Sequence, residues 1–194
     1  MTERTAAVRD HAATRLRDLA RLADRAADTL PDEIAGAVRL VREVLDAGGT
    51  LFFCGNGGSA ADAQHIAAEY VVRYMRNRRA LPAIALTTDT SLLTAAGNDL
   101  GFPEIFARQV EALVGTEDLL VVHSTSGSSP NVIRAAEAAR AKGARVLGLT
   151  ARDGGGLRAL ADVAIVVPTD RTDRAQELHL CIQHLICELV DADA

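Results

Sequence analysis

Five short apolar segments, separated by residues with helical composition, constrain the fold of this 194-residue chain more than any other feature. A strand buried on both faces has no side exposed to water, so its residues are apolar without alternation. Such strands alternating with helices indicate a parallel sheet covered by helices on both sides. The expected strands are Leu51–Cys54, Ala83–Leu86, Leu119–Val122, Val146–Leu149 and Val163–Val167. We therefore predict an α/β fold, a doubly wound five-stranded parallel sheet in three αβα layers.

Helices are expected before and between these strands. Residues 4 to about 48 predict helix throughout, and Pro31 marks the start of a second helix because proline suits the first helical turn. In that helix one apolar stripe has helical spacing: Ile34, Val38, Val41 and Leu45. Further helices are expected near residues 59–75, 103–113, 130–142 and 172–191. The chain thus divides into an N-terminal helical segment, 1–48, which packs against a partner subunit or its own core, and an α/β domain, 49–194.

Two loops of small residues each follow an expected strand and open a helix. The first is Cys54–Ala60 (CGNGGSA) and the second is Ser124–Ser129 (STSGSS). Glycines let the backbone approach a ligand closely, hydroxyls add donors, and free N–H groups at a helix start attract anions. With the flavodoxin-like strand order 2-1-3-4-5, the loops after the first and third strands meet where ligands bind. We therefore expect a crevice for a phosphorylated small molecule.

The first loop also fits the glycine pattern of a dinucleotide-binding fold, through Gly55, Gly57 and Ala60. That interpretation needs an acidic residue about 20 positions further on to bind the ribose. The first candidate, Asp89, lies well beyond that distance. No Gly-Lys-Ser/Thr follows either loop, which excludes a Walker A motif. The sequence thus favours a site without a nucleotide cofactor.

The second loop is the more specific phosphate candidate. Four hydroxyls precede the proline that opens the next helix and can surround a phosphate monoester without a lysine: Ser124, Thr125, Ser126 and Ser129. A serine-rich cap and turn is the alternative. Asn98 and Asp99 offer contacts to sugar hydroxyls, although a turn explains them equally well.

Two expected helices carry residues able to do chemistry. Asp62, His65 and Glu69 share one helical face, so an imidazole and a carboxylate can bind a metal or share acid–base work. A solvated polar face is the alternative. On the last helix, Gln176 and His184 lie apart from the apolar stripe, so we expect His184 to be solvated or aimed into a cleft, while His179 lies near that stripe. The stripe contains Leu178, Cys181, Ile182, Leu185, Ile186 and Leu189.

Composition narrows the choice of partners and compartment. A net charge of −5 argues against nucleic acid and acidic membranes as partners. No apolar run approaches the roughly 20 residues needed to span a bilayer, and the polar N-terminus lacks a signal-peptide core. Cys54, Cys181 and Cys187 have no CxxC spacing and suit reduced packing residues. We expect a soluble cytoplasmic protein that uses a carboxylate and a histidine to isomerise a sugar phosphate.

Six motifs resemble those of the SIS (sugar isomerase) domain family, and the similarity runs nearly end to end. They are CGNGGS from Cys54, LPAIAL from Leu81, GND from Gly97, STSG from Ser124, LTARDGG from Leu149 and QELH from Gln176. The resemblance is strongest to the branch that isomerises a seven-carbon sugar phosphate through an enediol. It implies that residues 49–194 form the SIS isomerase domain. It also implies a homotetramer with sites between subunits, in which the N-terminal helices serve assembly.

The resemblance assigns roles to individual positions. It implies Glu69 as the catalytic base and His184 as the acid. It implies one zinc ion per subunit, as seen in some members, held by His65, Glu69, Gln176 and His184. The substrate would contact Asn56, Gly57, Gly58, Ser59, Glu69, Arg73, Asn98, Asp99 and Gln176. Its phosphate would lie against Ser124, Thr125, Ser126 and Ser129.

The sequence departs from the family pattern in three places. Ser128 stands where Asn is usual, His123 stands where a small or apolar residue is commoner, and Tyr70–Val72 replaces Leu-Thr/Val-Gly. These changes leave the fine specificity open. One family relative is a tetrameric scaffold that binds the replication initiator DnaA, and other members isomerise pentose or hexose phosphates. The scaffold carries non-catalytic residues where this chain keeps Glu69 and His184, which favours the isomerase.

Overall fold

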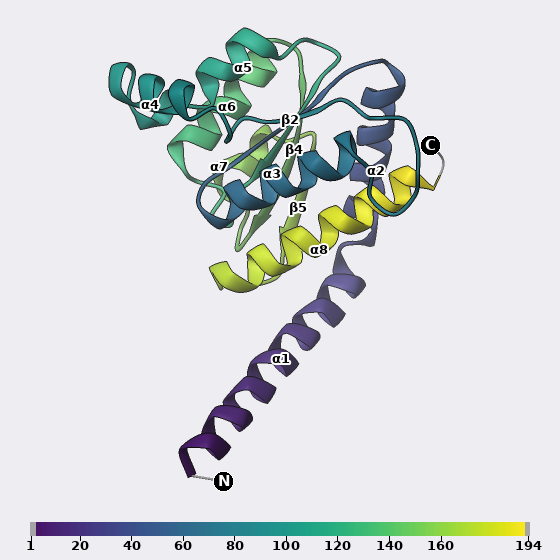
Figure 1. Ribbon diagram of the computed structural model, residues 1–194, viewed down its shortest axis with the longest axis vertical. Helices are drawn as coiled ribbons and strands as arrows, with labels where there is room; N and C mark the ends of the chain where they lie inside the picture. Colours follow the sequence, from purple (N-terminus) through teal and green to yellow (C-terminus); the bar gives the residue numbers. More distant parts are fainter. Residues whose placement is uncertain (1–2, 193–194) are drawn as a thin grey trace.

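The computed structural model describes residues 3–192 and has a five-stranded parallel sheet at its centre (Figure 1). Its strand order, β2-β1-β3-β4-β5, confirms the predicted doubly wound fold. The strands are β1 (Leu51–Gly55), β2 (Ala83–Ala85), β3 (Leu119–His123), β4 (Arg145–Ala151) and β5 (Val163–Val167). Gly55 of β1 and Leu149 of β4 are both in register with His123 of β3, so the two small-residue loops leave the same edge of the sheet.

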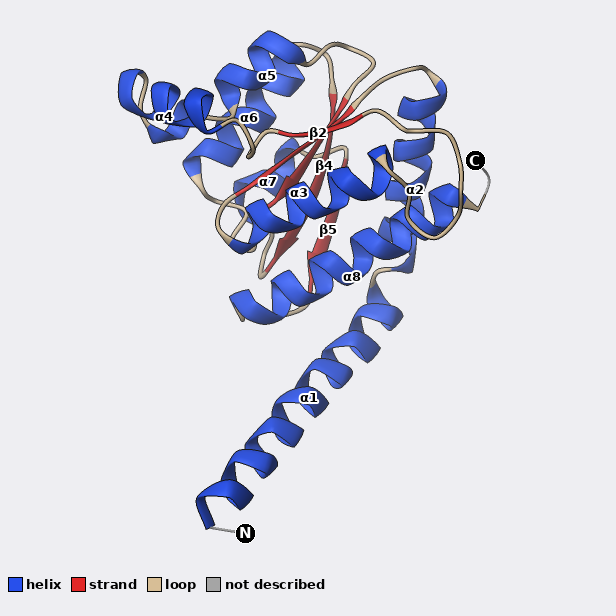
Figure 2. Cartoon of the chain, in the orientation of Figure 1, coloured by secondary structure: helices blue, strands red, loops and turns tan. Residues whose placement is uncertain are grey.

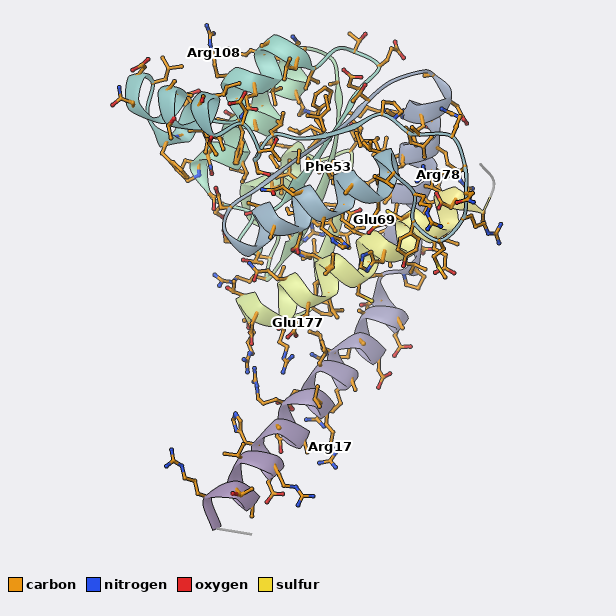
Figure 3. The ribbon with its side chains drawn as sticks, viewed as in Figure 1. Arg17, Phe53, Glu69, Arg78, Arg108 and Glu177 are labelled. Atoms are coloured by element: carbon orange, nitrogen blue, oxygen red, sulfur yellow. The ribbon has the colours of Figure 1, made fainter. Side chains whose placement is uncertain are left out.

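Helices cover both faces of the sheet (Figure 2). One face is covered by α2 (Pro31–Asp46), α3 (Gly58–Val71) and α8 (Thr172–Asp191), and the core between them includes Phe53, which lies inside the molecule in Figure 3. The other face is covered by α4 (Thr90–Asp99), the 3-10 turn η1 (Phe102–Glu104), α5 (Ala107–Leu113), α6 (Pro130–Ala141) and α7 (Gly155–Leu160). The two cores meet only through the sheet, as expected for a three-layer α/β domain.

Two helices were not predicted from the sequence, and one ends early. Helix α4 begins where the Asp89 carboxylate accepts a hydrogen bond from the backbone N–H of Leu92 (2.9 Å). Asp89 is therefore a helix cap, a role that aspartate favours, and not a ribose ligand. The six-residue α7 begins after Gly154 in the left-handed conformation. Helix α3 ends at Val71, four residues before the expected end.

Helix α1 (Glu3–Thr29) extends away from the rest of the molecule (Figure 1). Its outer part exposes apolar side chains, and Leu16 is 69% exposed. Its C-terminal part joins the core at Leu22 and Ala26, with Leu19 packed against it, whereas α2 buries its stripe against the sheet. Arg15 also pairs with Asp173 at the start of α8 (2.9 Å). The division of the chain near residue 48 stays a prediction.

Helix α8 is rotated relative to the expected apolar stripe. Leu178, Ile182 and Ile186 are buried as predicted, but the rest of the stripe is exposed: Cys181, Leu185 and Leu189. The buried face instead takes in His179 and Gln183, both of which find polar partners inside the molecule. All three cysteines are free, and the prediction of a packing residue is wrong for Cys181, which is exposed. No helix in residues 3–192 is both long enough and apolar enough to cross a membrane.

Candidate active site

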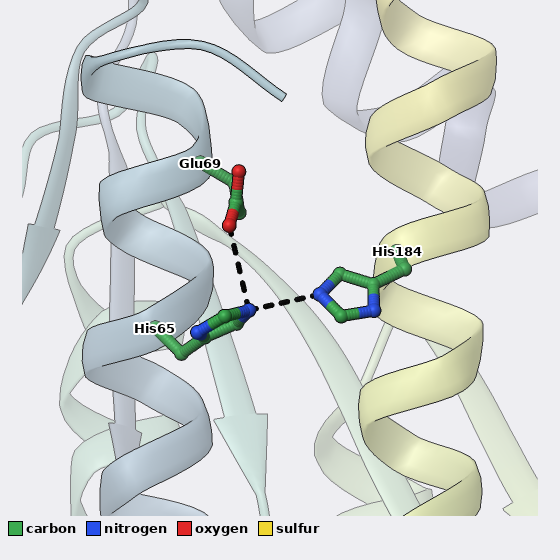
Figure 4. Close-up of side chains that lie close together, drawn as sticks. All are labelled: His65, Glu69 and His184. Atoms are coloured by element: carbon green, nitrogen blue, oxygen red, sulfur yellow. Dashed lines mark hydrogen bonds and ion pairs between the residues drawn. The ribbon is translucent and has the colours of Figure 1, made fainter. Parts of the chain in front are cut away.

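Three side chains from α3 and α8 converge on one point (Figure 4). The Nε2 atoms of His65 and His184 are 2.9 Å apart, and Oε1 of Glu69 lies 3.4 Å from Nε2 of His65. His65 and Glu69 share a face because they are four residues apart on one helix. The two helices pack side by side, which brings His184 to that face. The structure therefore joins His65, Glu69 and His184, as predicted.

The environment of this group favours a neutral His184. Partial burial, and then the nearby His65, lower the pKa of the His184 imidazole, while Glu69 acts in the opposite direction. The ring of Tyr74 stacks on that of His184, with centroids 5.4 Å apart. A neutral imidazole can both bind a metal and exchange a proton near neutral pH. His184 is half-buried and is not a core residue.

The chemistry of this group fits zinc. The three candidate ligand atoms lie within 4.8 Å of one another, and two imidazoles with one carboxylate are a common catalytic zinc set that leaves a position open. The 2.9 and 3.4 Å separations are close to the spacing of about 3.3 Å expected between ligands about 2.0–2.1 Å from one tetrahedral zinc ion. The predicted fourth ligand, Gln176, lies two turns earlier on α8, which is about 12 Å along the helix from His184.

The hydroxyl loop, residues Ser124–Ser129, borders a polar cavity of about 160 Å³. The cavity brings both small-residue loops together with the first turns of α8. Its lining consists of Asn56, Ser59, His123, Ser124, Thr125, Ser126, Ser129, Thr172 and Gln176. A partly open cavity of this size, lined by hydroxyls and amides at a helix start, suits a phosphate group. The predicted phosphate residues are thus placed together.

The shape of the hydroxyl loop leaves donors for a ligand. Ser124 Oγ accepts from the N–H of Gly127 (3.2 Å), and Ser126 Oγ accepts from the N–H of Ser128 (3.3 Å). Because each hydroxyl also has one hydrogen to donate, these two remain available to an anion. Ser129 precedes α6 without capping it through its side chain. Gly127 has φ +60° and lies so close to Gly154 that a Cβ would be 2.0 Å from its carbonyl oxygen.

A reciprocal amide pair joins the first loop to the start of α6, directly after the hydroxyl loop. Asn56 donates to Oδ1 of Asn131 (2.9 Å), and Asn131 donates to Oδ1 of Asn56 (2.8 Å). Gly58, at the start of α3, admits the Gln176 side chain, since a Cβ there would lie 2.7 Å from the Gln176 amide nitrogen. Gly58 therefore serves close packing beside the cavity, whereas Gly57 has open space around it and a positive φ of +57°. Next to this loop, on the α4 side, lies a second, mostly apolar cavity of about 510 Å³.

Other predicted residues lie outside these two groups. Asn98 and Asp99 are hydrogen-bonded to each other (2.7 Å) at the exposed end of α4, on the other side of the sheet from α8 (Figure 1). Arg73 is exposed after α3. Asp62 lies on α3 near His65, and burial raises the pKa of its carboxyl. His179 is fully buried and donates to the carbonyl of Thr150 (3.0 Å), which makes it a structural residue.

Comparison with known proteins shows the family of this chain. The SIS domain model matches residues 16–151. A phosphoheptose isomerase from Aliarcobacter butzleri is 51% identical over 164 residues, 84% of this chain and 87% of that protein. One from Solidesulfovibrio magneticus is 53% identical over 187 residues, 95% of this chain and 86% of that protein. The chain belongs to the SIS domain family, among the phosphoheptose isomerases.

Solved structures of phosphoheptose isomerases share the fold of this chain. The enzyme from Neisseria gonorrhoeae superimposes with a TM-score of 0.90 at 42% identity, covering 95% of this chain and 99% of its own. The enzyme from Francisella tularensis gives 0.92 at 36% identity, covering 99% and 100%. The five-stranded sheet and its helices are therefore those of the family.

In this phosphoheptose isomerase family member, four site residues were missed from the sequence. Thr172 and Asn131 border or support the cavity, Tyr74 stacks on His184, and Gln183 contacts His123. The position of Asn131 directly after Pro130, at a helix start beside the hydroxyl loop, was a usable signal. The other three depend on contacts between distant segments and leave no local pattern.

Proposed function

We propose that this protein is an aldose–ketose isomerase that converts sedoheptulose 7-phosphate to D-glycero-D-manno-heptose 7-phosphate in heptose biosynthesis. One observation carries the proposal. Helix α8 borders the hydroxyl cavity with Gln176 and joins the His65–Glu69 pair with His184. A phosphate held in the cavity would direct the other end of an extended sugar chain along α8 toward those groups. The names of the relatives support a heptose phosphate as the substrate.

The proposed reaction is a pair of proton transfers. The Glu69 carboxylate removes a proton from C1 of the ketose, and the C2 carbonyl oxygen becomes the hydroxyl of a cis-enediol. His184 donates and accepts the protons of the two oxygens as the carbonyl moves from C2 to C1. A proton returned to C2 completes the aldose. Each group ends in its starting state, so no redox cofactor is consumed.

Zinc, where bound, would be held by His65, Glu69 and His184 and would stabilise negative charge that develops on the substrate oxygen. Glu69 would serve both as a zinc ligand and as the base. Nε2 of His65 lies 3.4 Å from Oε1 of Glu69 and would help to orient the carboxylate. Gln176 stays proposed as a substrate contact and as a ligand in an altered side-chain position. Imidazole and amide donors fixed on two packed helices would lower the energy of an enediolate, because they are already oriented before the reaction.

The remaining contacts are proposed from their positions. Hydroxyls of Ser124, Thr125, Ser126 and Ser129 would bind the phosphate, and the loop of Asn56, Gly57, Gly58 and Ser59 would contact the sugar. Arg73, Asn98 and Asp99 would complete the site of a neighbouring subunit, since all three are exposed at the surface of one chain. The exposed apolar side chains of α1 support a homotetramer assembled through this helix. Three unpaired cysteines support a cytoplasmic location.

The test is NMR of sedoheptulose 7-phosphate incubated with the protein in deuterium oxide. Formation of the aldose with deuterium at C2 in the wild type, and its absence in Glu69→Gln, would establish the reaction and the base together. Pentose and hexose phosphates serve as controls of substrate class. No conversion with or without added zinc would contradict the proposal and favour another sugar phosphate or a DnaA-binding scaffold, which a pull-down distinguishes.

A further inference from the structure

His123 and Gln183 form a buried polar pair that the proposed chemistry does not use. His123 is the last residue of β3, is fully buried and directly precedes the hydroxyl loop. Gln183 is buried on α8, directly before His184. Its side-chain amide donates to Nε2 of His123 over 2.8 Å. One hydrogen bond therefore joins the strand end where the loop begins to the helix that carries His184.

The surroundings of this pair restrict the positions of both side chains. The His123 ring packs on Phe53, with centroids 6.3 Å apart, and Phe53 packs on Tyr70. Burial, and then the neighbouring His179, lower the pKa of His123 to about 3, so the ring is neutral at neutral pH. Its Nε2 faces the Gln183 amide nitrogen, which can only donate, and therefore accepts that hydrogen bond. A buried amide that loses its partner here would be left unsatisfied, which destabilises the folded protein. Helix α8 thus has little freedom to slide relative to β3.

We propose that His123 and Gln183 are positioning residues that fix the spacing between the hydroxyl loop and His184. This inference rests on the proposed function, in which the loop holds the phosphate while Glu69 and His184 act on the far end of the same molecule. A substrate held at both ends reacts well only when the two ends are in register, and a misplacement of about 1 Å can cost about 100-fold in rate. The pair acts through this spacing and not on the reacting carbons.

The kinetic test compares His123→Leu, Gln183→Leu and the double variant. Each should lower kcat for sedoheptulose 7-phosphate at least about tenfold. In Gln183→Leu the Ki of inorganic phosphate should stay within about twofold, because Gln183, unlike His123, does not line the cavity. The double variant leaves no unpaired polar partner, so it should regain melting temperature over the single variants. Its kcat should stay low. Recovery of kcat together with melting temperature in the double variant, or a rise in the phosphate Ki of Gln183→Leu that matches its loss in kcat, would overturn the proposal.

Gln109→Leu is the matched control. Gln109 is an equally buried glutamine on α5, and it donates to the carbonyls of Leu86 and Ile105 (2.9 and 2.8 Å). Its loss should lower the melting temperature without lowering kcat. An equal loss of kcat in this variant would show that kcat follows stability alone, which contradicts a positioning role.

A second measurement needs no turnover. Inorganic phosphate bound at the hydroxyl loop should slow amide hydrogen exchange in residues 181–187 of the wild type, because the loop is tied to α8. In the double variant the same phosphate should bind without slowing exchange there. Slower exchange in a wild-type protein that proves inactive would contradict the proposed function but support the coupling of the loop to α8 through His123 and Gln183. Absence of protection in the wild type, or its persistence in the double variant, would overturn the pair.

Discussion

The Nε2 atoms of His65 and His184 lie 2.9 Å apart, although these residues are 119 positions apart in the chain. Their helices pack side by side on one face of the sheet, and Glu69 lies one turn beyond His65 on α3. Two imidazole nitrogens and a carboxylate oxygen are therefore close enough to exchange a proton or to bind one metal ion together. The acid–base role and the ligand role predict different effects of substitution.

Glu69→Gln should abolish turnover and leave substrate binding nearly intact. The amide keeps the shape of the carboxylate but cannot accept the C1 proton, and loss of a general base costs about 10²–10⁴-fold in rate. Single-turnover kinetics with titration calorimetry of substrate binding would separate the two effects. Activity comparable to wild type would remove Glu69 from the role of base.

His184→Asn should slow the reaction strongly, by about 10²–10⁴-fold, because the proton shuttle between the two oxygens is lost. His179 cannot replace it, since its Nε2–H is committed to the carbonyl of Thr150 inside the core. The measurement is kcat across pH in the variant and the wild type. A mild effect would point to water as the proton carrier.

His65→Asn should lower zinc content more than it lowers phosphate binding, because His65 belongs to the candidate metal-binding group and does not line the hydroxyl cavity. Elemental analysis of purified protein, with the zinc-dependent rise in melting temperature, measures the site without reference to activity. Ser128→Ala is the control, because Ser128 neither belongs to the candidate metal-binding group nor lines the hydroxyl cavity. Full activity after exhaustive chelation, with no metal by elemental analysis, would end the zinc proposal.

Ser129→Ala should weaken phosphate binding through loss of one hydroxyl donor. A hydrogen bond to a charged group contributes about 1.5–3 kcal/mol, which corresponds to an increase of about 10- to 150-fold in KM and in the Ki of inorganic phosphate. Helix α6 should be unaffected because Ser129 makes no side-chain cap bond. Ser128→Ala again serves as the control, since its hydroxyl donates to the Ser126 carbonyl. Equal Ki values in both variants would place the phosphate elsewhere.

Stability should fall on acidification between about pH 6.5 and pH 3–4. Burial lowers the pKa of His123 to about 3 and that of His179 to about 4 in the folded protein. In the unfolded chain both imidazoles have their usual pKa near 6.5, so below pH 6.5 the unfolded chain binds protons that the folded protein does not. Stability is therefore complete above pH 6.5 and falls as pH falls, by up to about 1.4 kcal/mol per pH unit for each histidine. Urea unfolding across this range measures the slope. The His123→Leu/Gln183→Leu variant should have a shallower slope, and an unchanged slope would refute the neutral, buried state of His123.

Local patterns were enough to predict a parallel sheet covered on both faces, and the flavodoxin-like strand order assumed for it is the one observed. Uniformly apolar strands need cover on both faces, and this requirement is visible in segments as short as Leu119–Val122. Helical spacing alone places His65 and Glu69 on one face. Helix α4 was missed because its start depends on one capping contact, from Asp89 to the N–H of Leu92, which competes with a turn in the same residues.

The sequence by itself determined the layers of the fold, the two loops at one edge of the sheet, and the residues that could act there. Only the tertiary structure decided which face of α8 is buried. An apolar stripe sets a helix roughly, but burial of His179 and Gln183 depends on acceptors at Thr150 and His123 in distant strands. Because a buried polar group is stable only when it is paired, these contacts rotate α8 away from its most apolar face. They also aim His184 at His65, and no local pattern contains that information.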